Sequence, residues 1–177
     1  MLWVLLIYSV PSEPTRKRAF IWRELKKAGA VYLRDGVCVL PDGPDTRHAL
    51  QAVAATVREY EGQATVLEGA RLEDETAARL MAQAQTARQS EYAAVVEAAE
   101  QLLGHLRRET EHREFTEHEL EVLEADLAKL YRWYDQIRAR DYVGTGVDRR
   151  PSETLAECTE ALARFLDETF ARAEAAR

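Results

Sequence analysis

The fold is decided by a segment that reads Leu2-Trp-Val-Leu-Leu-Ile-Tyr-Ser-Val10, Pro-Ser12-Glu-Pro14, Thr-Arg-Lys-Arg-Ala-Phe-Ile-Trp-Arg-Glu-Leu25. The first nine residues are a nearly continuous apolar run, which predicts a buried strand. The Pro-Ser-Glu-Pro turn ends this strand, and Ser12 is the expected N-cap of a basic amphipathic helix. The free N–H groups and the dipole of a helix N-terminus favour negative charge, so this junction is suited to an anion.

The next forty-odd residues continue this pattern. Residues 30–34 and 37–40 are rich in β-formers and are joined by Asp35-Gly36, a strong hairpin signal. Residues 45–61 follow as a helix capped by Asp45 or Thr46, and residues 63–68 form the last strand. The order strand, helix, strand, strand, helix, strand predicts a ferredoxin-like βαββαβ domain over residues 1–71, with an α+β fold class for the chain. Both helices are expected to cover one sheet face and to bury Trp22, Leu25, Val53 and Val57.

From residue 72 the composition shifts to Ala, Glu, Leu and Arg. We predict a long helix over residues 74–113, a second from an N-cap at Thr116, and a third after Pro151. Their apolar seams comprise Tyr92, Val95, Ala99, Leu102 and Leu106; Leu120, Leu123, Leu127, Leu130, Tyr134 and Ile137; and Leu155, Cys158, Leu162, Phe165 and Leu166. Residues 72–177 are therefore predicted to be a helical domain, a three-helix antiparallel bundle or coiled-coil region.

Charge is divided unevenly along the 177 residues. The net charge is −7, but residues 1–71 carry ten basic and eight acidic side chains, against fourteen and twenty-three in the remainder. A phosphate-bearing partner should therefore meet the first domain. The two cysteines, Cys38 and Cys158, are expected to be reduced core thiols. The N-terminal apolar run is too short to span a bilayer and lacks the features of a signal peptide, so we expect a cytoplasmic protein without a membrane partner.

The first helix supplies the main candidate site. Arg16, Phe20, Arg23 and Lys27 share one helical stripe, which we call the basic stripe, and Lys17 and Lys26 flank it. The stripe is suited to a phosphate backbone. The alternative is an ordinary solvated helix face.

Arg18 differs because it points toward the Leu25 face, where a charge needs a partner. That partner is either a carboxylate such as Glu13, or a tetrahedral oxyanion held by Arg16, Arg18 and the free N–H groups. Chromate and sulfate are dianions of this shape. Near the end of the second long helix, Arg138 and Arg140 either cap the helix or join the first helix in an anion-lined cleft.

The helical part contains His105, Glu109 and His112 on one face, with His118 and Glu121 beyond the next turn. Such residues can ligate Zn²⁺ or Fe²⁺. Because a full paired Glu-x-x-His motif is missing, we interpret them as a charged bundle face and expect no metal and no cofactor.

Several motifs carry a resemblance to a known family. They are Tyr8-Ser-Val-Pro-Ser-Glu-Pro-Thr-Arg-Lys-Arg18, Trp22-Arg-Glu-Leu-Lys-Lys-Ala-Gly-Ala30, Gly36-Val-Cys-Val-Leu-Pro41 and Leu130-Tyr-Arg-Trp-Tyr-Asp-Gln-Ile-Arg-Ala-Arg-Asp-Tyr142. In these the sequence resembles the N-terminal domain of the chromate-resistance protein ChrB. The resemblance implies a non-enzymatic cytoplasmic regulator of a chromate-efflux operon that binds promoter DNA and responds to chromate. Longer members carry a second domain, which is not expected in this chain.

Two other functions remain as alternatives. The ferredoxin-like core is similar to that of phenylacetate-operon repressors and of small CRISPR-associated nucleases. In the nucleases an Asp at the end of the first strand holds metal; Ser9 stands there here and is a poor Mg²⁺ ligand, which argues against a metal-dependent nuclease. The other alternative is a protein-interaction module that forms a homo-dimer through its helices or a sheet edge.

Overall fold

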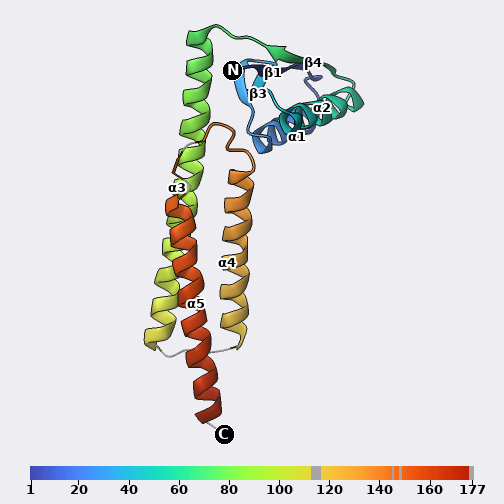
Figure 1. Ribbon diagram of the computed structural model, residues 1–177. Helices are drawn as coiled ribbons and strands as arrows, with labels where there is room; N and C mark the ends of the chain where they lie inside the picture. The colour runs from blue at the N-terminus through green and yellow to red at the C-terminus, as the bar shows by residue number, and fades with distance from the viewer. Residues whose placement is uncertain (113–116, 145, 148, 176–177) are drawn as a thin grey trace. The chain divides into compact units, whose positions relative to one another are not determined.

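The computed structural model describes residues 1–112, 117–144, 146–147 and 149–175. In these ranges it contains a four-stranded antiparallel sheet and five helices, a mixed α+β structure. The elements are β1 (Trp3–Ser9), α1 (Thr15–Lys27), β2 (Val31–Arg34), β3 (Val37–Pro41), α2 (Pro44–Glu59), β4 (Gln63–Ala70), α3 (Asp74–His112), α4 (Glu117–Arg138) and α5 (Arg149–Ala175) (Figure 1). None of the helices in these ranges is long and apolar enough to cross a membrane.

The chain forms two compact units. The first comprises residues 1–87 and 140–144, and the second comprises residues 88–139 and 145–177. The division falls within α3, so this one helix contributes its first turns to the sheet unit and its remainder to the helical unit. The domain boundary predicted at residue 71 stays a prediction.

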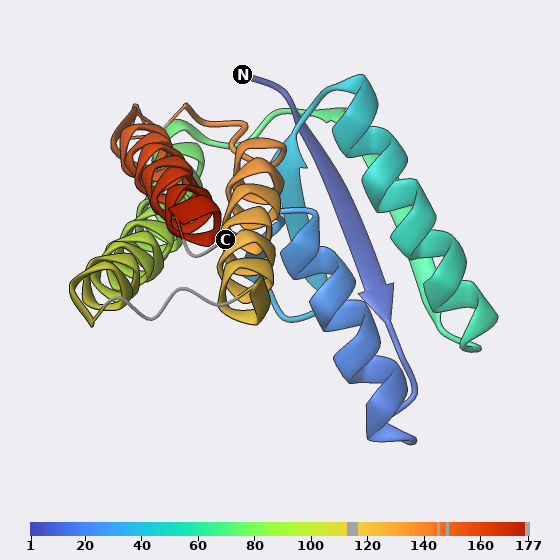
Figure 2. The ribbon, with the colours of Figure 1, turned by 90° about the horizontal axis from the view of Figure 1, so that it is seen from below.

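The strands of the first unit lie in the order β2-β3-β1-β4, and every neighbouring pair is antiparallel. Helices α1 and α2 cover the same face of this sheet (Figures 1 and 2). Alternation along β1 explains the two faces, because successive side chains of a strand point to opposite sides. Val4 and Leu6 pack with the two helices, whereas Trp3 and Leu5 pack with Leu80 from the start of α3.

The expected hairpin and helices are present, with small differences at their ends. The strands around Asp35-Gly36 pair as predicted. Helix α1 begins at Thr15 with Pro14 as its N-cap, so the prediction of Ser12 as N-cap was wrong. Helix α2 begins at Pro44 after Gly43, and the Thr46 hydroxyl donates to the carbonyls of Pro41 and Gly43. Thr116, the predicted cap of the next helix, lies outside the described residues.

Burial confirms most of the predicted core of the first unit. Leu25, Val53 and Val57 are buried beneath the sheet, as their periodicity indicated. Trp22 is the exception, since half of its surface is exposed and the Lys26 ammonium lies 5.2 Å from its ring centre. The prediction that Trp22 is buried was therefore wrong. Ile21, one residue earlier, takes its place in the core.

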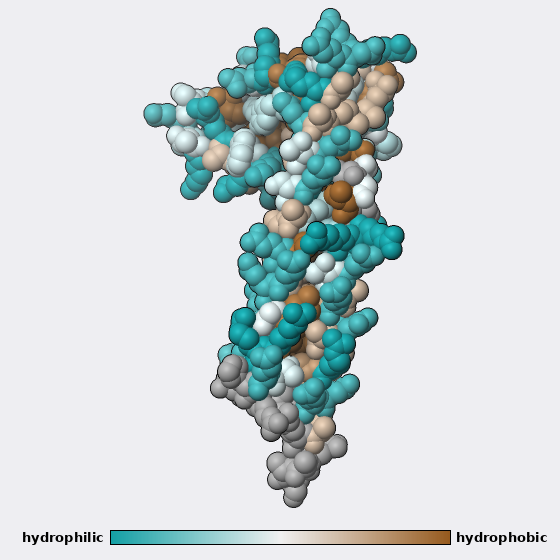
Figure 3. All heavy atoms as spheres, turned by 90° about the vertical axis from the view of Figure 1, so that its left-hand side faces the viewer, coloured by the Kyte–Doolittle hydropathy of each residue, from teal (hydrophilic) through white to brown (hydrophobic). Residues whose placement is uncertain are grey.

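The helical unit has its own core. The apolar faces of α3, α4 and α5 share one cluster, which includes Tyr92, Val95, Ala99, Leu102, Leu106, Leu123, Leu127, Leu130, Tyr134, Ile137, Leu155, Cys158, Leu162 and Phe165. These are nearly all the residues that the three predicted seams contain. The face of this unit seen in Figure 3 is largely hydrophilic, with small apolar patches, as expected of helices that bury one stripe each.

Candidate functional site

The main candidate site is a hollow of about 840 Å³ in the first unit, which we call the α1 hollow. It lies where β1 ends, α1 begins and the β2–β3 turn closes. The residues with polar side chains that line it are Tyr8, Ser9, Ser12, Thr15, Arg18, Tyr32 and Asp35. Trp22 and Gly36 also line the hollow. The junction between the first strand and the first helix, to which the sequence pointed, is therefore a real concavity.

Two phenols stand at the sheet side of the α1 hollow. The hydroxyl oxygens of Tyr8 and Tyr32 lie 2.9 Å apart and share a hydrogen bond. Burial raises the pKa of Tyr8, although Tyr32 and the Arg18 charge act in the opposite direction. Burial, with the hydrogen bond from Tyr8, also raises the pKa of Tyr32. Both phenols are therefore neutral near pH 7, and the one that accepts the shared hydrogen bond keeps its own O–H for a ligand.

The N-terminus of α1 opens beside these phenols. Its N-cap residue, Pro14, has no side chain that can accept a hydrogen bond, and the first turn contains no acidic residue. The backbone N–H groups of this turn and the positive end of the helix dipole are thus left uncompensated by side chains of the helix itself. Thr15 and Ser12 add hydroxyl groups to the wall. This end of the hollow has the chemistry of an anion site.

Arg18 lies on the α1 wall of the hollow. Its side chain is exposed and, among the residues the structure describes, it forms no ion pair. The prediction that Arg18 points inward was therefore wrong. Of the two partners considered for it, a carboxylate does not pair with it among the described residues, and the oxyanion stays a prediction. Its charge is close enough to the Tyr8 hydroxyl to act on the pKa of that group. The acidic residue that lines the hollow is Asp35, between β2 and β3, and its charge partly offsets that of Arg18.

The basic stripe lies on a different side of α1. Arg16 and Arg18 are two positions apart, about 200° around the helix, so they do not face each other. Arg16 and Arg23 are exposed, while the Lys27 ammonium pairs with Glu24 at 2.7 Å. The structure therefore separates the predicted cations into two sets, and only Arg18 of these lines the hollow.

Phe20 of the basic stripe and the flanking Lys17 both contact Tyr60, at the C-terminus of α2. The Phe20 ring makes an edge contact with Tyr60, with ring centres 6.0 Å apart. The Lys17 ammonium lies 5.4 Å from the centre of the same Tyr60 ring and 3.9 Å from a carboxylate oxygen of Glu61. Both side chains are half-buried, so neither presents a free surface to a nucleic acid in the way Arg16 and Arg23 do.

The arginines near the end of α4 do not belong to the hollow. The Arg138 guanidinium stacks 5.6 Å from the ring centre of Tyr134, within the helical unit. Arg140 packs against Gly29 in the first unit, where a Cβ on that glycine would lie 3.2 Å from the Arg140 Cβ. Gly29 follows the C-terminus of α1, about 20 Å along the helix from its first turn. Arg140 is therefore at the wrong end of α1 to contribute to the hollow.

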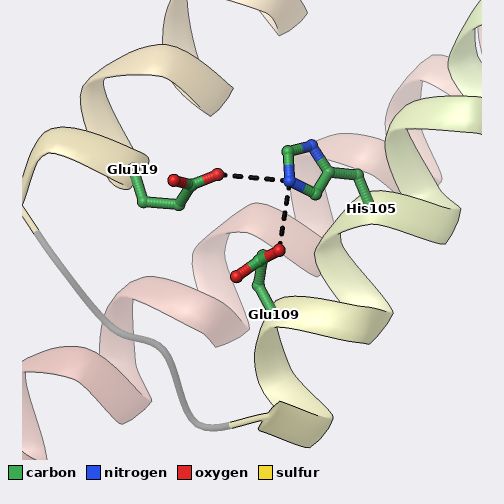
Figure 4. Close-up of side chains that lie close together, drawn as sticks. All are labelled: His105, Glu109 and Glu119. Atoms are coloured by element: carbon green, nitrogen blue, oxygen red, sulfur yellow. Dashed lines mark ion pairs between the residues drawn. The ribbon is translucent and has the colours of Figure 1, made fainter.

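Side chains able to hold a metal ion occur together in the helical unit. His105 and Glu109 of α3 lie beside Glu119 of α4, with the imidazole Nε2 3.2 Å from an oxygen of each carboxylate (Figure 4). The sequence pointed to His105 and Glu109, but not to Glu119. Two of the other residues considered, His118 and Glu121, are exposed on α4. The side chain of His112 lies outside the described residues.

Both cysteines are buried and free. Burial raises the pKa of Cys38 to about 12 and that of Cys158 to about 11, and the Cys158 thiol donates to the Ala99 carbonyl. Neither thiol is activated as a nucleophile, in agreement with the prediction of inert core thiols.

Sequence comparison places these features in a family. The family model described as Protein ChrB, N-terminal, matches residues 18–176. A Protein ChrB of Cupriavidus metallidurans is 37% identical over 65 residues, which make up 37% of this chain and 20% of that relative. The alignment thus spans about a fifth of the relative's length. No solved structure matches the chain. Because the family model covers most of its residues, the chain belongs to the ChrB N-terminal domain family.

Proposed function

We propose that this chain is a cytoplasmic regulator or accessory protein of chromate resistance, not an enzyme, which binds a chromate-type oxyanion and promoter DNA through α1. The observation that carries the proposal is the α1 hollow. It is lined both by Arg18, which forms no ion pair with any described residue, and by the first turn of α1, whose N-terminus has no side-chain cap. Membership of the ChrB family supports the chromate context.

The hollow suits a small tetrahedral dianion. A guanidinium presents paired N–H donors to two oxygens, and charge-assisted bonds of this kind are among the strongest in proteins. The free phenol hydrogen of the Tyr8–Tyr32 pair, the Ser12 and Thr15 hydroxyls and the first N–H groups of α1 can reach further oxygens. Asp35 repels an anion, so affinity depends strongly on Arg18, the single cation among the described residues of the wall.

DNA binding is assigned to the basic stripe. Arg16 and Arg23 are two turns apart on α1, are exposed, and form no ion pair with any described residue. Arginines on an exposed helix face neutralise backbone phosphates, which gives salt-dependent binding with little sequence information. Because the stripe and the hollow lie on different sides of one helix, an oxyanion in the hollow would act on the same element that contacts DNA.

The oxyanion proposal is tested by calorimetric titration of the 177-residue chain with chromate and with sulfate. We expect saturable binding by the wild type and its loss in Arg18→Gln, which removes the charge but keeps a long polar side chain. Arg23→Gln is the matched control, because it removes another exposed charge from α1 outside the hollow. Equal heats for wild type and Arg18→Gln would refute the assignment.

The DNA proposal is tested by a mobility-shift assay with the DNA upstream of the coding sequence. We expect the double variant with Arg16→Gln and Arg23→Gln to bind DNA more weakly than the wild type. The slope of the logarithm of the binding constant against the logarithm of the salt concentration should become shallower by about one for each phosphate that is no longer neutralised. Arg18→Gln should still bind DNA but lose the effect of added chromate. Wild-type protein that causes no shift at low salt would overturn DNA binding and favour a protein-interaction module.

We also interpret the first unit as a ferredoxin-like fold and the second as an antiparallel three-helix bundle. The strand order β2-β3-β1-β4, with both crossover helices on one face, supports the first interpretation. The shared core of α3, α4 and α5 supports the second. A Ser at the end of β1, where the nucleases hold an Asp, leaves the nuclease alternative without its metal ligand.

A further inference from the structure

The helical unit contains three metal-ligand side chains that converge from two helices. His105 and Glu109 are one turn apart on α3, and Glu119 is in the first turn of α4. Their ligand atoms all lie within 4.8 Å of one another, and Figure 4 shows both carboxylates directed at the same edge of the imidazole ring. We call these three residues the His105 cluster.

A proton does not satisfy this arrangement well. The Nε2 atom is 3.2 Å from an oxygen of Glu109 and 3.2 Å from an oxygen of Glu119. A protonated Nε2 carries one N–H, which the two carboxylate oxygens would have to share. A neutral ring with its proton on Nδ1 would instead direct a lone pair at two negative charges. A divalent cation would accept electron pairs from all three atoms at once.

The distances already approach those of a metal centre. Ligand atoms about 2.0–2.1 Å from a tetrahedral zinc ion lie about 3.3 Å from one another. Two of the three separations in the cluster are 3.2 Å, and the third is at most 4.8 Å. A cation would attract both carboxylates and so offset their mutual repulsion, which favours a shorter third separation.

We propose that His105, Glu109 and Glu119 bind a divalent first-row transition metal ion, with Zn²⁺ as the reference ion. One imidazole nitrogen with two carboxylate oxygens suits Zn²⁺, Fe²⁺, Co²⁺ or Ni²⁺ better than Mg²⁺ or Ca²⁺, which prefer oxygen ligands alone. The side chains are 36%, 18% and 29% exposed, so an ion can enter from solvent and keep water in its remaining positions. This site is independent of the α1 hollow and of its proposed function.

The ion would tie α3 to α4. Leu106 and Leu123 are buried in the core that the two helices share, close in sequence to His105 and Glu119 respectively. The bound metal is therefore expected to stabilise the helical unit, since a ligand that binds only the folded state raises its stability.

The test uses the 177-residue chain stripped with a chelator and titrated with Zn²⁺ by calorimetry and with Co²⁺ by absorption spectroscopy. We expect one equivalent of either ion, a raised melting temperature, and NMR signals that place the metal on Nε2 of His105 with the proton on Nδ1. Glu119→Gln and Glu109→Gln keep the side-chain shape and should each weaken Zn²⁺ binding by at least about tenfold.

His118→Ala is the matched control, because it removes an exposed imidazole one residue from Glu119 without touching the cluster. Its affinity for Zn²⁺ should equal that of the wild type. Wild-type protein that binds neither ion, or a Glu119→Gln variant that binds Zn²⁺ as tightly as the wild type, would overturn the proposal. A loss of binding in His118→Ala as large as that in the Gln variants would also overturn it. Because the Gln variants are nearly isosteric, melting curves of the metal-free proteins show whether folding itself has changed.

Discussion

The hydroxyl oxygens of Tyr8 and Tyr32 lie 2.9 Å apart, although their strands are not neighbours in the sheet. Strand β3 runs between β1 and β2, and Cys38 occupies the intervening position opposite both Leu6 and Tyr32. The two long phenols therefore meet above a small side chain. This contact lies at the sheet side of the α1 hollow.

Removal of either phenol hydroxyl should destabilise the first unit. Tyr8→Phe and Tyr32→Phe each leave a half-buried hydroxyl without its partner, which we expect to cost about 1 kcal/mol in the free energy of unfolding. The double variant should cost less than the two single changes together, because no orphaned hydroxyl remains. Urea unfolding of the four proteins measures this coupling. Strictly additive losses of unfolding free energy would show that the two hydroxyls have no coupling energy, which would contradict the prediction.

Stability should fall in alkaline solution because of the buried thiols. The pKa values of Cys38 and Cys158 are raised from 9.0 to about 12 and about 11, so the unfolded chain loses these protons at lower pH than the folded chain does. The contribution of the two protonated thiols to the free energy of unfolding is complete below about pH 9, and it declines as pH rises toward their folded-state pKa values. Cys38→Ala should therefore flatten the dependence of the unfolding free energy on pH between about 8 and about 10.5.

Absolute stability is not the readout in that experiment, since Cys38→Ala also removes buried volume. The slope with pH is compared instead, with Cys158→Ala as the equivalent change in the helical unit. The raised pKa values of Tyr8 and Tyr32 add a further loss only above about pH 10. A slope that is the same in the wild type and in both cysteine variants would contradict the prediction.

The sequence predicted the elements well because their signals are local. The Asp35-Gly36 turn and the periodic seams identify hairpin and helices without knowledge of their partners. Trp22 and Arg18 were misplaced for one reason: they are four residues apart at the margin of the apolar stripe, where a small rotation of α1 decides between core and solvent. Both line the hollow instead.

The site residues that the sequence did not reveal depend on non-local pairing. Tyr32 reaches Tyr8 only in the observed strand register, and Glu119 reaches His105 only at the observed rotation of α4 against α3. Neither quantity is encoded in a short motif. Strand alternation does place Tyr8 on the same face as Val4 and Leu6, so its side could have been inferred.

Gly36, in the turn between β2 and β3, and Gly69, in β4, offer a matched pair of glycine substitutions. Gly36 has φ +72°, and a Cβ there would lie 2.7 Å from the Tyr8 carbonyl oxygen. Gly69 has a similar φ of +65°, but nothing lies within 4 Å of its Cβ position. Gly69→Ala should cost about 1–2 kcal/mol from backbone strain alone. Gly36→Ala should cost more, because the Tyr8 backbone must also move, and unfolding free energies that are equal for the two variants would contradict this.

Acid should weaken the first unit through Asp42. The Arg47 guanidinium donates to both oxygens of this carboxylate, from Nε at 2.5 Å and from Nη2 at 2.8 Å, and the Gly69 N–H donates at 3.0 Å. The hydrogen bonds from Arg47 lower the pKa of Asp42, so the stabilisation is present above the unfolded-state pKa of about 4 and is lost as pH falls through the folded-state pKa.

Asp42→Asn should therefore lower the urea midpoint at pH 7 and reduce its dependence on pH in acid. Glu24→Gln, which removes the partly exposed carboxylate paired with Lys27, is the control and should change little. The prediction fails if Asp42→Asn keeps the wild-type acid dependence, since another carboxylate must then be responsible for it.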